Sequence, residues 1–296
     1  MTPDLLDRAG RPALVVPFVK MNGAGNDFVV LDNRFLRFSD DELAALAGRF
    51  CPRRTGIGAD GLLALDDADG DADFRMRYRN ADGSLGTMCG NGARCLARFA
   101  ARAGLGTEAD GVVALAFDTD GGPYRATVGG RAASGDVALD VPPPRGFGPA
   151  GVASDPDVLR IWTGTEHAVV FTDDAASADV AGTGARLRHD AAFAPTGTNV
   201  DFVEVLQTGL DARVRARTFE KGVEAETLAC GTGALASALA ARLAGRLGDA
   251  DRQSVAVEMP GGTLAVTFRL DGDAVADLTL AGPAETGYEG TLEWLG

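Results

Sequence analysis

Short segments in which apolar and polar residues alternate recur along most of the chain. The clearest lies at 74–78, where Phe74, Met76 and Tyr78 alternate with arginines. A period of two is typical of a strand with one buried face. Because Gly, Asp or Pro turns separate most of these segments, we expect mainly antiparallel pairing. The pattern predicts strands at 15–19, 28–32, 62–65, 74–78, 112–117, 124–128, 136–141, 167–172, 200–206, 213–219, 255–259, 263–268 and 274–280.

Three segments carry helical signals instead. Ser39 followed by Glu42 forms a capping box that marks a helix start. In the second segment, Arg94 and Arg98 lie off the apolar face. The third is small and apolar almost all the way round, so we expect it to be buried on every side, as inside a curved sheet. The predicted helices span 39–48, 92–103 and 232–246.

The chain contains an internal repeat. Cys89-Gly-Asn-Gly-Ala, where the second helix begins, is matched by Cys230-Gly-Thr-Gly-Ala at the start of the third. A length of 296 residues also favours two domains over one. The Pro-rich segment 141–145 can continue neither a helix nor a sheet and indicates a nearby boundary. We predict a first domain of residues 1–130, to which 283–296 return, and a second of 131–282.

The charge balance restricts the partners of the protein. There are 28 Lys and Arg residues against 42 Asp and Glu, a formal net charge of −14. Such a field repels phosphate backbones and anionic lipids, so we expect neither nucleic acid nor membrane partners. No apolar stretch has the length of a membrane span, and Asp4 and Asp7 stand where a signal peptide carries positive charge. We therefore expect a soluble, cytoplasmic protein.

Residues that usually hold cofactors are scarce. Lys20 and Lys221 are the only lysines, His167 and His189 are the only histidines, and the four cysteines form no C-x-x-C pair. Pyridoxal phosphate needs a Schiff-base lysine, and a zinc site normally needs closely spaced cysteines and histidines. We therefore expect no cofactor and no metal.

The two cysteine turns suggest a specific chemistry. A cysteine just before a helix meets the unpaired N–H groups and positive dipole of the helix start, which lower its pKa. The glycines after it let an anion approach the same N–H groups. Two such turns could hold one carboxylate between two thiols, where one sulfur removes an α-proton and the other returns a proton to the opposite face.

A structural interpretation of these turns is also open. A single Cys-Gly pair before a helix is more often a packed small residue at a tight turn. Two copies, each after a polar loop, favour the functional interpretation for Cys89 and Cys230. Cys51 and Cys95 have no matching context, and we expect them to be buried.

Several long segments resemble the diaminopimelate epimerase family: KMNGAGNDFVVLDN at 20–33, GIGADG at 56–61, RNADGS and MCGNGARC within 79–95, TNVDFVEV at 198–205, ETLACGTGA at 226–234 and MPGG at 259–262. The resemblance implies a cofactor-independent isomerase that interconverts LL- and meso-diaminopimelate in lysine and peptidoglycan precursor biosynthesis. It also implies an α+β fold of two similar domains, each a curved, mainly antiparallel sheet or barrel around a central helix, and a homodimer.

The resemblance assigns roles to individual residues. Cys89 and Cys230 match the acid–base pair, and His167 and Glu220 match residues that assist the two thiols. The remaining matches are substrate-binding. They comprise the backbone donors Gly90, Asn91, Gly231 and Thr232, the asparagines Asn26, Asn80 and Asn199, largely at the far end of the substrate, and Glu220 and Lys221.

Two positions depart from the family pattern. Thr165 and Glu166 stand before His167 where the family usually has Asn-Pro, and Lys221 replaces an arginine that pairs with the far carboxylate. A lysine cannot reproduce the bidentate fork of a guanidinium. Two alternatives therefore stay open beside diaminopimelate epimerisation. One is a two-cysteine racemase acting on a different amino acid, and the other is a non-catalytic protein that binds an anion or senses redox state.

Overall fold

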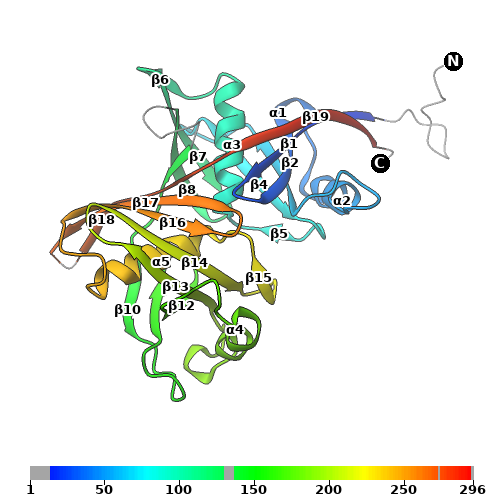
Figure 1. Cartoon of the computed structure of the whole chain (residues 1–296). Coiled ribbons are helices and arrows are strands. Elements are labelled where there is room, and N and C mark those ends of the chain that lie inside the picture. Colours follow the sequence, from blue (N-terminus) through cyan, green and yellow to red (C-terminus); the bar gives the residue numbers. More distant parts are fainter. Residues whose placement is uncertain (1–13, 130–136, 273, 295–296) are drawn as a thin grey trace. The chain divides into compact units, whose positions relative to one another are not determined.

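The computed structural model of the protein describes residues 14–129, 137–272 and 274–294. Contacts divide the chain into two compact units, Met1–Val137 with Pro283–Gly296, and Ala138–Gly282. The C-terminal strand β19 (Glu285–Trp294) belongs to the first unit, where it pairs antiparallel with β1 (Leu14–Gly23) (Figure 1). The predicted boundary between residues 130 and 131 lies outside the described residues.

The sheet of the first unit has the strand order β19-β1-β2-β3-β4-β7-β8. Neighbours are antiparallel except for β2–β3 and β4–β7, which are parallel. The short strand β5 pairs antiparallel with β4, and the short strand β6 pairs antiparallel with β7. The bounds are β2 Asn26–Asp32, β3 Gly61–Asp66, β4 Phe74–Asn80, β5 Leu85–Gly86, β6 Thr107–Ala109, β7 Val112–Thr119 and β8 Gly122–Gly129.

The second unit has the order β10-β11-β12-β13-β14-β16-β17-β18, with β15 on β14 and β9 on β18. Its parallel pairs are β12–β13 and β14–β16. The bounds are β9 Val137–Asp140, β10 Arg145–Pro149, β11 Leu159–Trp162, β12 Glu166–Phe171, β13 Asn199–Gln207, β14 Asp211–Glu220, β15 Ala225–Thr227, β16 Arg252–Met259, β17 Gly262–Asp271 and β18 Ala274–Gly282.

The two sheets repeat one pattern of strand directions. The series β1, β2, β3, β4, β7, β8 has the same alternation of antiparallel and parallel pairs as β11, β12, β13, β14, β16, β17. Parallel pairs need long crossovers, and helices lie in all four of them. The C-G-x-G-A repeat therefore marks a structural repeat, and the expectation of two similar, mainly antiparallel units is confirmed.

Each unit has a central helix that begins at its cysteine turn. Helix α3 (Gly90–Arg102) packs against β1, β2, β3, β4, β7 and β8, and α5 (Gly231–Leu243) packs against the six matching strands of its own unit. Every residue of α5 from 233 to 241 is buried. The nearly all-apolar sequence of this helix is explained by a sheet that surrounds it, as predicted.

A second helix covers the other face of each sheet. Helix α2 (Asp40–Phe50) starts with the predicted capping box, in which Ser39 N donates to Glu42 Oε2 at 2.8 Å. It packs into an apolar cluster with β1, β2 and β3. Helix α4 (Val180–Arg188), which the sequence pattern did not predict, packs on β13 and β14.

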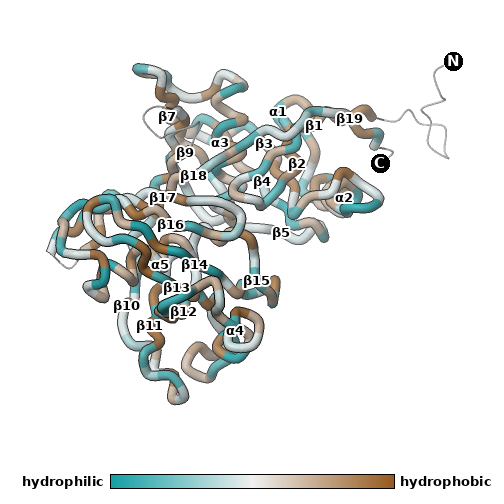
Figure 2. Tube along the Cα trace, in the orientation of Figure 1, coloured by the Kyte–Doolittle hydropathy of each residue, from teal (hydrophilic) through white to brown (hydrophobic). Residues whose placement is uncertain are grey.

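These outer helices change the hydrophobic pattern of the central strands. The first five residues of β3 and of β13 are all buried, because both faces of each strand are covered. Along β7 and β16, in contrast, buried positions alternate with more exposed ones. Figure 2 shows that hydrophobic and hydrophilic residues both occur along the strands of each unit. The structure also adds the short helices α1 (Asn33–Leu36) and η1 (Ala191–Phe193). None of the helices in the described part of the chain is long and apolar enough to cross a membrane.

Candidate active site

Cys89 occupies the N-cap of α3 with extended backbone angles, and its carbonyl accepts the first helical hydrogen bond from Ala93 N at 2.8 Å. Its thiol lies 3.5 Å from Asn26 Oδ1, which also accepts a hydrogen bond from Asn91 Nδ2 at 3.3 Å. Asn26 thus lies beside the sulfur, although the resemblance assigned the asparagines largely to the far end of the substrate.

A charged network fixes the orientation of Asn26. Its Nδ2 donates to Asp60 Oδ2 at 2.6 Å, and Arg53 bridges Asp60 and Asp27 at 2.6 and 2.7 Å. Lys20 pairs with Asp27 at 2.6 Å and donates to Gly58 O. Partial burial favours the neutral form of Asp27, but Arg53 and Lys20 hold its pKa well below the usual range. The Asn26 amide oxygen is therefore directed at the cysteine turn.

Arg94 supports the same turn from inside the unit. The sequence pattern placed it off the apolar face of the helix, yet its side chain is fully buried. It donates to Asn91 Oδ1 at 2.8 Å, to Gly90 O at 3.4 Å and to Pro283 O at 3.5 Å. Because these oxygens satisfy the guanidinium, a buried arginine can hold the first turn of α3 in place.

Cys230 has the equivalent N-cap position on α5, with different partners. Its sulfur accepts a hydrogen bond from Gly233 N at 3.3 Å and lies 3.4 Å from Thr232 Oγ1. Burial, followed by the negative charges of Glu220 and Asp201, raises the pKa of Cys230 well above that of an ordinary thiol. The hydrogen bonds from Thr232 and Gly233 oppose this only in part. The predicted lowering of the pKa at the helix start is therefore wrong for Cys230, which is a thiol at neutral pH.

A buried chain of hydrogen bonds sets the tautomer of His167. Lys221 N donates to Asn199 Oδ1 at 2.7 Å, so Asn199 Nδ2 faces His167 Nε2 at 3.3 Å. Nε2 therefore accepts, and the ring proton lies on Nδ1, 2.7 Å from Asp201 Oδ2. Thr218 Oγ1 donates to the other oxygen of Asp201 at 2.7 Å. His167 is thus held as one tautomer.

Glu220 and Lys221 follow each other at the end of β14. Thr227 Oγ1 donates to Glu220 Oε2 at 2.7 Å, and the charge of Glu220 acts on Cys230. The ammonium of Lys221 lies 2.8 Å from Glu166 Oε2. Glu166 and Lys221, which both depart from the family pattern, therefore form one ion pair.

The turn before β12 lies against the Cys230 turn. Thr163 Oγ1 donates to Thr232 O at 2.8 Å. A Cβ on Gly164, whose φ is +111°, would lie 3.2 Å from Thr232 Cγ2. Thr165 Oγ1 then donates to Glu166 Oε2 at 3.2 Å. These contacts bring Thr165, Glu166 and His167 to the side of α5 where Cys230 lies.

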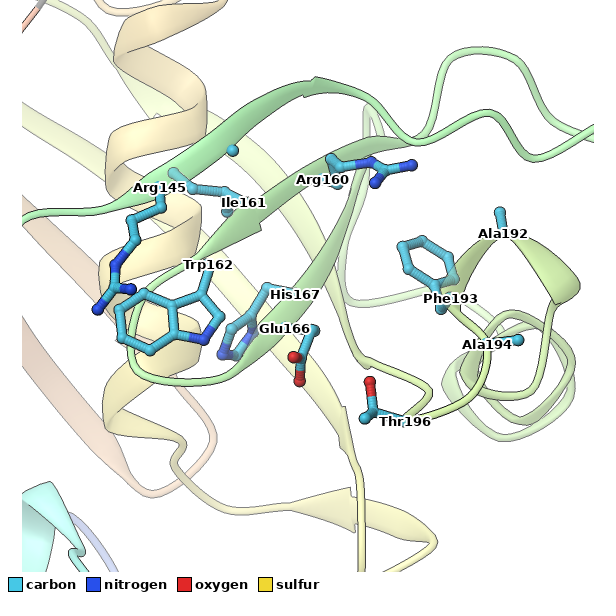
Figure 3. Close-up of a pocket in the computed structure, with 11 residues that line it drawn as sticks. Arg145, Arg160, Ile161, Trp162, Glu166, His167, Ala192, Phe193, Ala194 and Thr196 are labelled. Atoms are coloured by element: carbon cyan, nitrogen blue, oxygen red, sulfur yellow. The ribbon is translucent and has the colours of Figure 1, made fainter.

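A pocket of about 270 Å³ opens beside His167 in the second unit. Glu166 and His167 face it next to Trp162, with Phe193 and Thr196 across from them (Figure 3). The guanidinium of Arg145 lies 4.1 Å from the centre of the Trp162 ring. The pocket therefore combines an aromatic wall with charges of both signs.

The other predicted residues are placed as follows. Asn80 ends β4, and its Nδ2 donates to Ser84 Oγ at 3.0 Å within the exposed loop before the Cys89 turn. Cys51 and Cys95 are buried, as predicted. No group of three or more His, Cys, Asp or Glu side chains in the described ranges is arranged to hold a metal ion.

Sequence reasoning missed the residues that position the predicted ones, namely Arg94, Asp60, Asp201 and Glu166. A signal existed for Asp201, the charged residue in the otherwise apolar strand segment VDFV at 200–203, because a buried carboxylate requires partners. No comparable signal marks Asp60, which lies in a Gly-rich loop.

The comparisons with known proteins agree on one family. The sequence profile of the family "Diaminopimelate epimerase" matches residues 18–137 and 160–286. The diaminopimelate epimerase of Chlorobaculum tepidum is 40% identical over 275 residues, which cover 92% of this chain and 99% of the relative. That of Thermosynechococcus vestitus is 39% identical over 297 residues, covering 93% and 98%.

Solved structures share the fold at low sequence identity. A phenazine biosynthesis protein of the PhzF family from Bacillus anthracis gives a TM-score of 0.73 at 15% identity, covering 94% of this chain and 99% of the other. A hydroxyproline epimerase from Agrobacterium vitis gives 0.64 at 17% identity, covering 94% and 92%. These likenesses concern the fold and agree with the predicted α+β class. The sequence matches extend over most of the chain, and the chain therefore belongs to the diaminopimelate epimerase family.

Proposed function

We propose that the protein interconverts LL- and meso-diaminopimelate by proton transfer at the α-carbon, with Cys89 and Cys230 as acid and base. The observation that carries the proposal is the repeated cysteine turn, which places one thiol at the start of the equivalent central helix in each unit. Membership of the family makes the protein an isomerase and supports diaminopimelate as the substrate.

The chemistry of one turnover follows from the two turns. The Cys89 thiolate takes the α-proton, the C–H electron pair passes into the α-carboxylate as an enediolate, and the Cys230 thiol donates its proton to the opposite face of the carbon. The sulfurs have then exchanged protonation states, and the reverse reaction starts from Cys230. The raised pKa of Cys230 suits the donor role in the first direction.

The helix starts provide the electrostatic part of the proposal. The N–H groups of Gly90, Asn91, Gly231 and Thr232 lie in the first turns of α3 and α5, where helical N–H groups lack partners within the helix. Each helix end carries the equivalent of about half a positive charge. Two such ends offset the additional negative charge of the enediolate.

The neighbouring residues receive positioning roles. His167 is held in one ring orientation by Asn199 at Nε2 and by Asp201 at Nδ1. Glu220 acts on Cys230 through its charge. Asn26 orients the Cys89 thiol, and Asn80, Asn199 and Lys221 are assigned to the substrate.

The proposal extends to partners and location. It requires both thiols to be reduced, which favours a reducing compartment and supports a cytoplasmic enzyme. The only partner needed for the chemistry is the small amino-acid substrate, without cofactor or metal. A homodimer is proposed from the family resemblance.

An α-proton exchange screen tests the function. Wild-type protein is incubated in heavy water with LL-diaminopimelate, meso-diaminopimelate and a panel of ordinary amino acids, and deuterium uptake is measured by NMR. We expect rapid uptake with both diaminopimelate stereoisomers. Uptake with another amino acid alone would favour a racemase of different specificity, and no uptake with any would favour a redox-sensing or anion-binding protein.

A further inference from the structure

Lys221, the only lysine in the second unit, forms an ion pair with a carboxylate of the same unit. Lys221 Nζ lies 2.8 Å from Glu166 Oε2, and Thr165 Oγ1 donates to the same oxygen at 3.2 Å. Both side chains remain accessible, with exposed fractions of 25% for Lys221 and 42% for Glu166. The pair therefore presents a positive and a negative group side by side to a ligand.

Contacts connect this pair to the reacting end of the site. Lys221 N donates to Asn199, whose amide faces His167. On the other side, the 163–165 turn that precedes Glu166 touches Thr232, two residues after Cys230. Glu166 also lines the pocket beside His167 (Figure 3). A substrate whose α-carboxylate binds at the Cys230 turn can thus extend toward the pair.

The charge of the pair restricts what can bind there. Burial alone favours neutral Glu166, but the hydrogen bond and charge of Lys221 lower the pKa of Glu166, so it is ionised at neutral pH. A ligand end that carries only a carboxylate gains Lys221 and is repelled by Glu166. A ligand end that carries a carboxylate and an ammonium on one carbon matches both groups.

We propose that Glu166 is a specificity-determining residue that binds the ammonium at the far end of the substrate while Lys221 binds the far carboxylate. The inference rests on the proposed function, because it takes diaminopimelate as the substrate. Glu166 then selects a zwitterionic far end over a simple acid, a distinction that a lone lysine does not make.

The test compares two substrates on one enzyme preparation. Diaminopimelate and 2-aminoheptanedioate have the same carbon chain and both carboxylates, but the second lacks the far ammonium. We expect wild type to prefer diaminopimelate in kcat/KM for α-proton exchange, and Glu166→Gln to reduce that preference at least tenfold. Glu258→Gln is the matched control, since Glu258 forms an ion pair with Arg213 elsewhere in the same unit, and it should leave the preference unchanged.

The outcomes separate this inference from the proposed function. The ratio between substrates does not depend on the fraction of folded enzyme, so a destabilised variant still gives an answer. If Glu166→Gln leaves the ratio of the two kcat/KM values unchanged, the role of Glu166 is overturned and the epimerase proposal stays intact. Absence of exchange on diaminopimelate by wild type would instead refute the proposed function.

Discussion

Cys89 and Cys230 have the same position in the repeat and different surroundings. The sulfur of Cys89 faces an asparagine amide, whereas Cys230 is buried near Glu220 and Asp201. Sequence alone could identify both cysteines, because the C-G-x-G-A motif is local. It could not give their protonation, because the charges that act on Cys230 come from strands β13 and β14.

Asp201 offers a test of this electrostatic environment. Because its negative charge raises the pKa of Cys230, Asp201→Asn should lower that pKa. The pH midpoint for alkylation of Cys230 by iodoacetamide, followed by peptide mass spectrometry, should move to lower pH. Asp211→Asn, at the exposed start of β14, is the control and should not move it. An unchanged or raised midpoint in Asp201→Asn would contradict an effect of the Asp201 charge on Cys230.

Lys221 tests the assignment of the far end. Lys221→Ala removes the proposed partner of the far carboxylate and leaves Glu166 without its ammonium. We expect kcat/KM on diaminopimelate to fall by about 2–5 kcal/mol of transition-state stabilisation, roughly 30- to 4,000-fold. Lys221→Arg should retain or improve activity, because a guanidinium can bind a carboxylate in a bidentate manner. Near-normal activity of Lys221→Ala would place the far end elsewhere.

At the scale of elements, the two central helices differ in how tightly their second glycine is enclosed. A Cβ on Gly233 would lie 2.6 Å from Asp201 Oδ1 and 2.9 Å from Thr218 Oγ1, both in buried residues. At the equivalent Gly92 the nearest atom is Leu63 Cδ2 at 3.1 Å. In the second unit, the space beside the second glycine is therefore occupied by the carboxylate of Asp201, which positions His167.

Matched alanine substitutions test that difference. Gly233→Ala should destabilise the protein by about 1–3 kcal/mol, the usual cost of overpacking, and should impair exchange activity. Gly92→Ala should cost less than about 1 kcal/mol, since a side-chain methyl can move and alanine favours the helix. Urea unfolding and proton exchange measure both effects. Equal effects of the two substitutions would contradict the crowding at Gly233.

The elements that sequence reasoning found are those with local signals. The capping box at Ser39 and the apolar run of α5 were sufficient. Strand β19 was not predicted, because all ten of its residues are at least partly exposed and it therefore has no buried face. Helix α4 was not predicted, because two of its nine residues are glycines. Strand β11 was not predicted, because it has only four residues. Their positions depend on pairing with distant segments, which no local pattern contains.

At the scale of the whole molecule, buried thiols connect stability to pH. Burial raises the pKa of Cys51 and of Cys95 to about 12, and Cys230 is raised as well. The unfolded chain releases these protons near pH 9, whereas the folded chain retains them. The unfolded state is therefore favoured as pH rises, and stability should fall above about pH 9.

Urea unfolding midpoints measured between pH 8 and pH 10.5 check this expectation. The double variant Cys51→Ala, Cys95→Ala should be less stable at pH 8 because two buried groups are lost. Its stability should then decline less steeply with pH than that of wild type. Parallel declines for the two proteins would show that the thiols do not contribute to the alkaline loss.

The repeat of the two units could be predicted from the cysteine motif, but its extent could not. The pairing of six strands repeats, and so do the six strands that each central helix contacts, although little of the sequence does. A repeat of fold needs only equivalent patterns of burial, whereas a repeat of sequence needs equivalent chemistry. The C-G-x-G-A motif at the two cysteine turns is where the sequence itself repeats.

The origin of the proton in the product tests the two-cysteine account most directly. LL-diaminopimelate is converted in heavy water, and the first meso product and the remaining substrate are analysed for α-deuterium. Two bases predict product with full solvent deuterium at the inverted carbon and substrate that is still protonated, with conversion abolished in Cys89→Ala and in Cys230→Ala. Product that keeps the substrate's own proton, or conversion that survives loss of either cysteine, would contradict it.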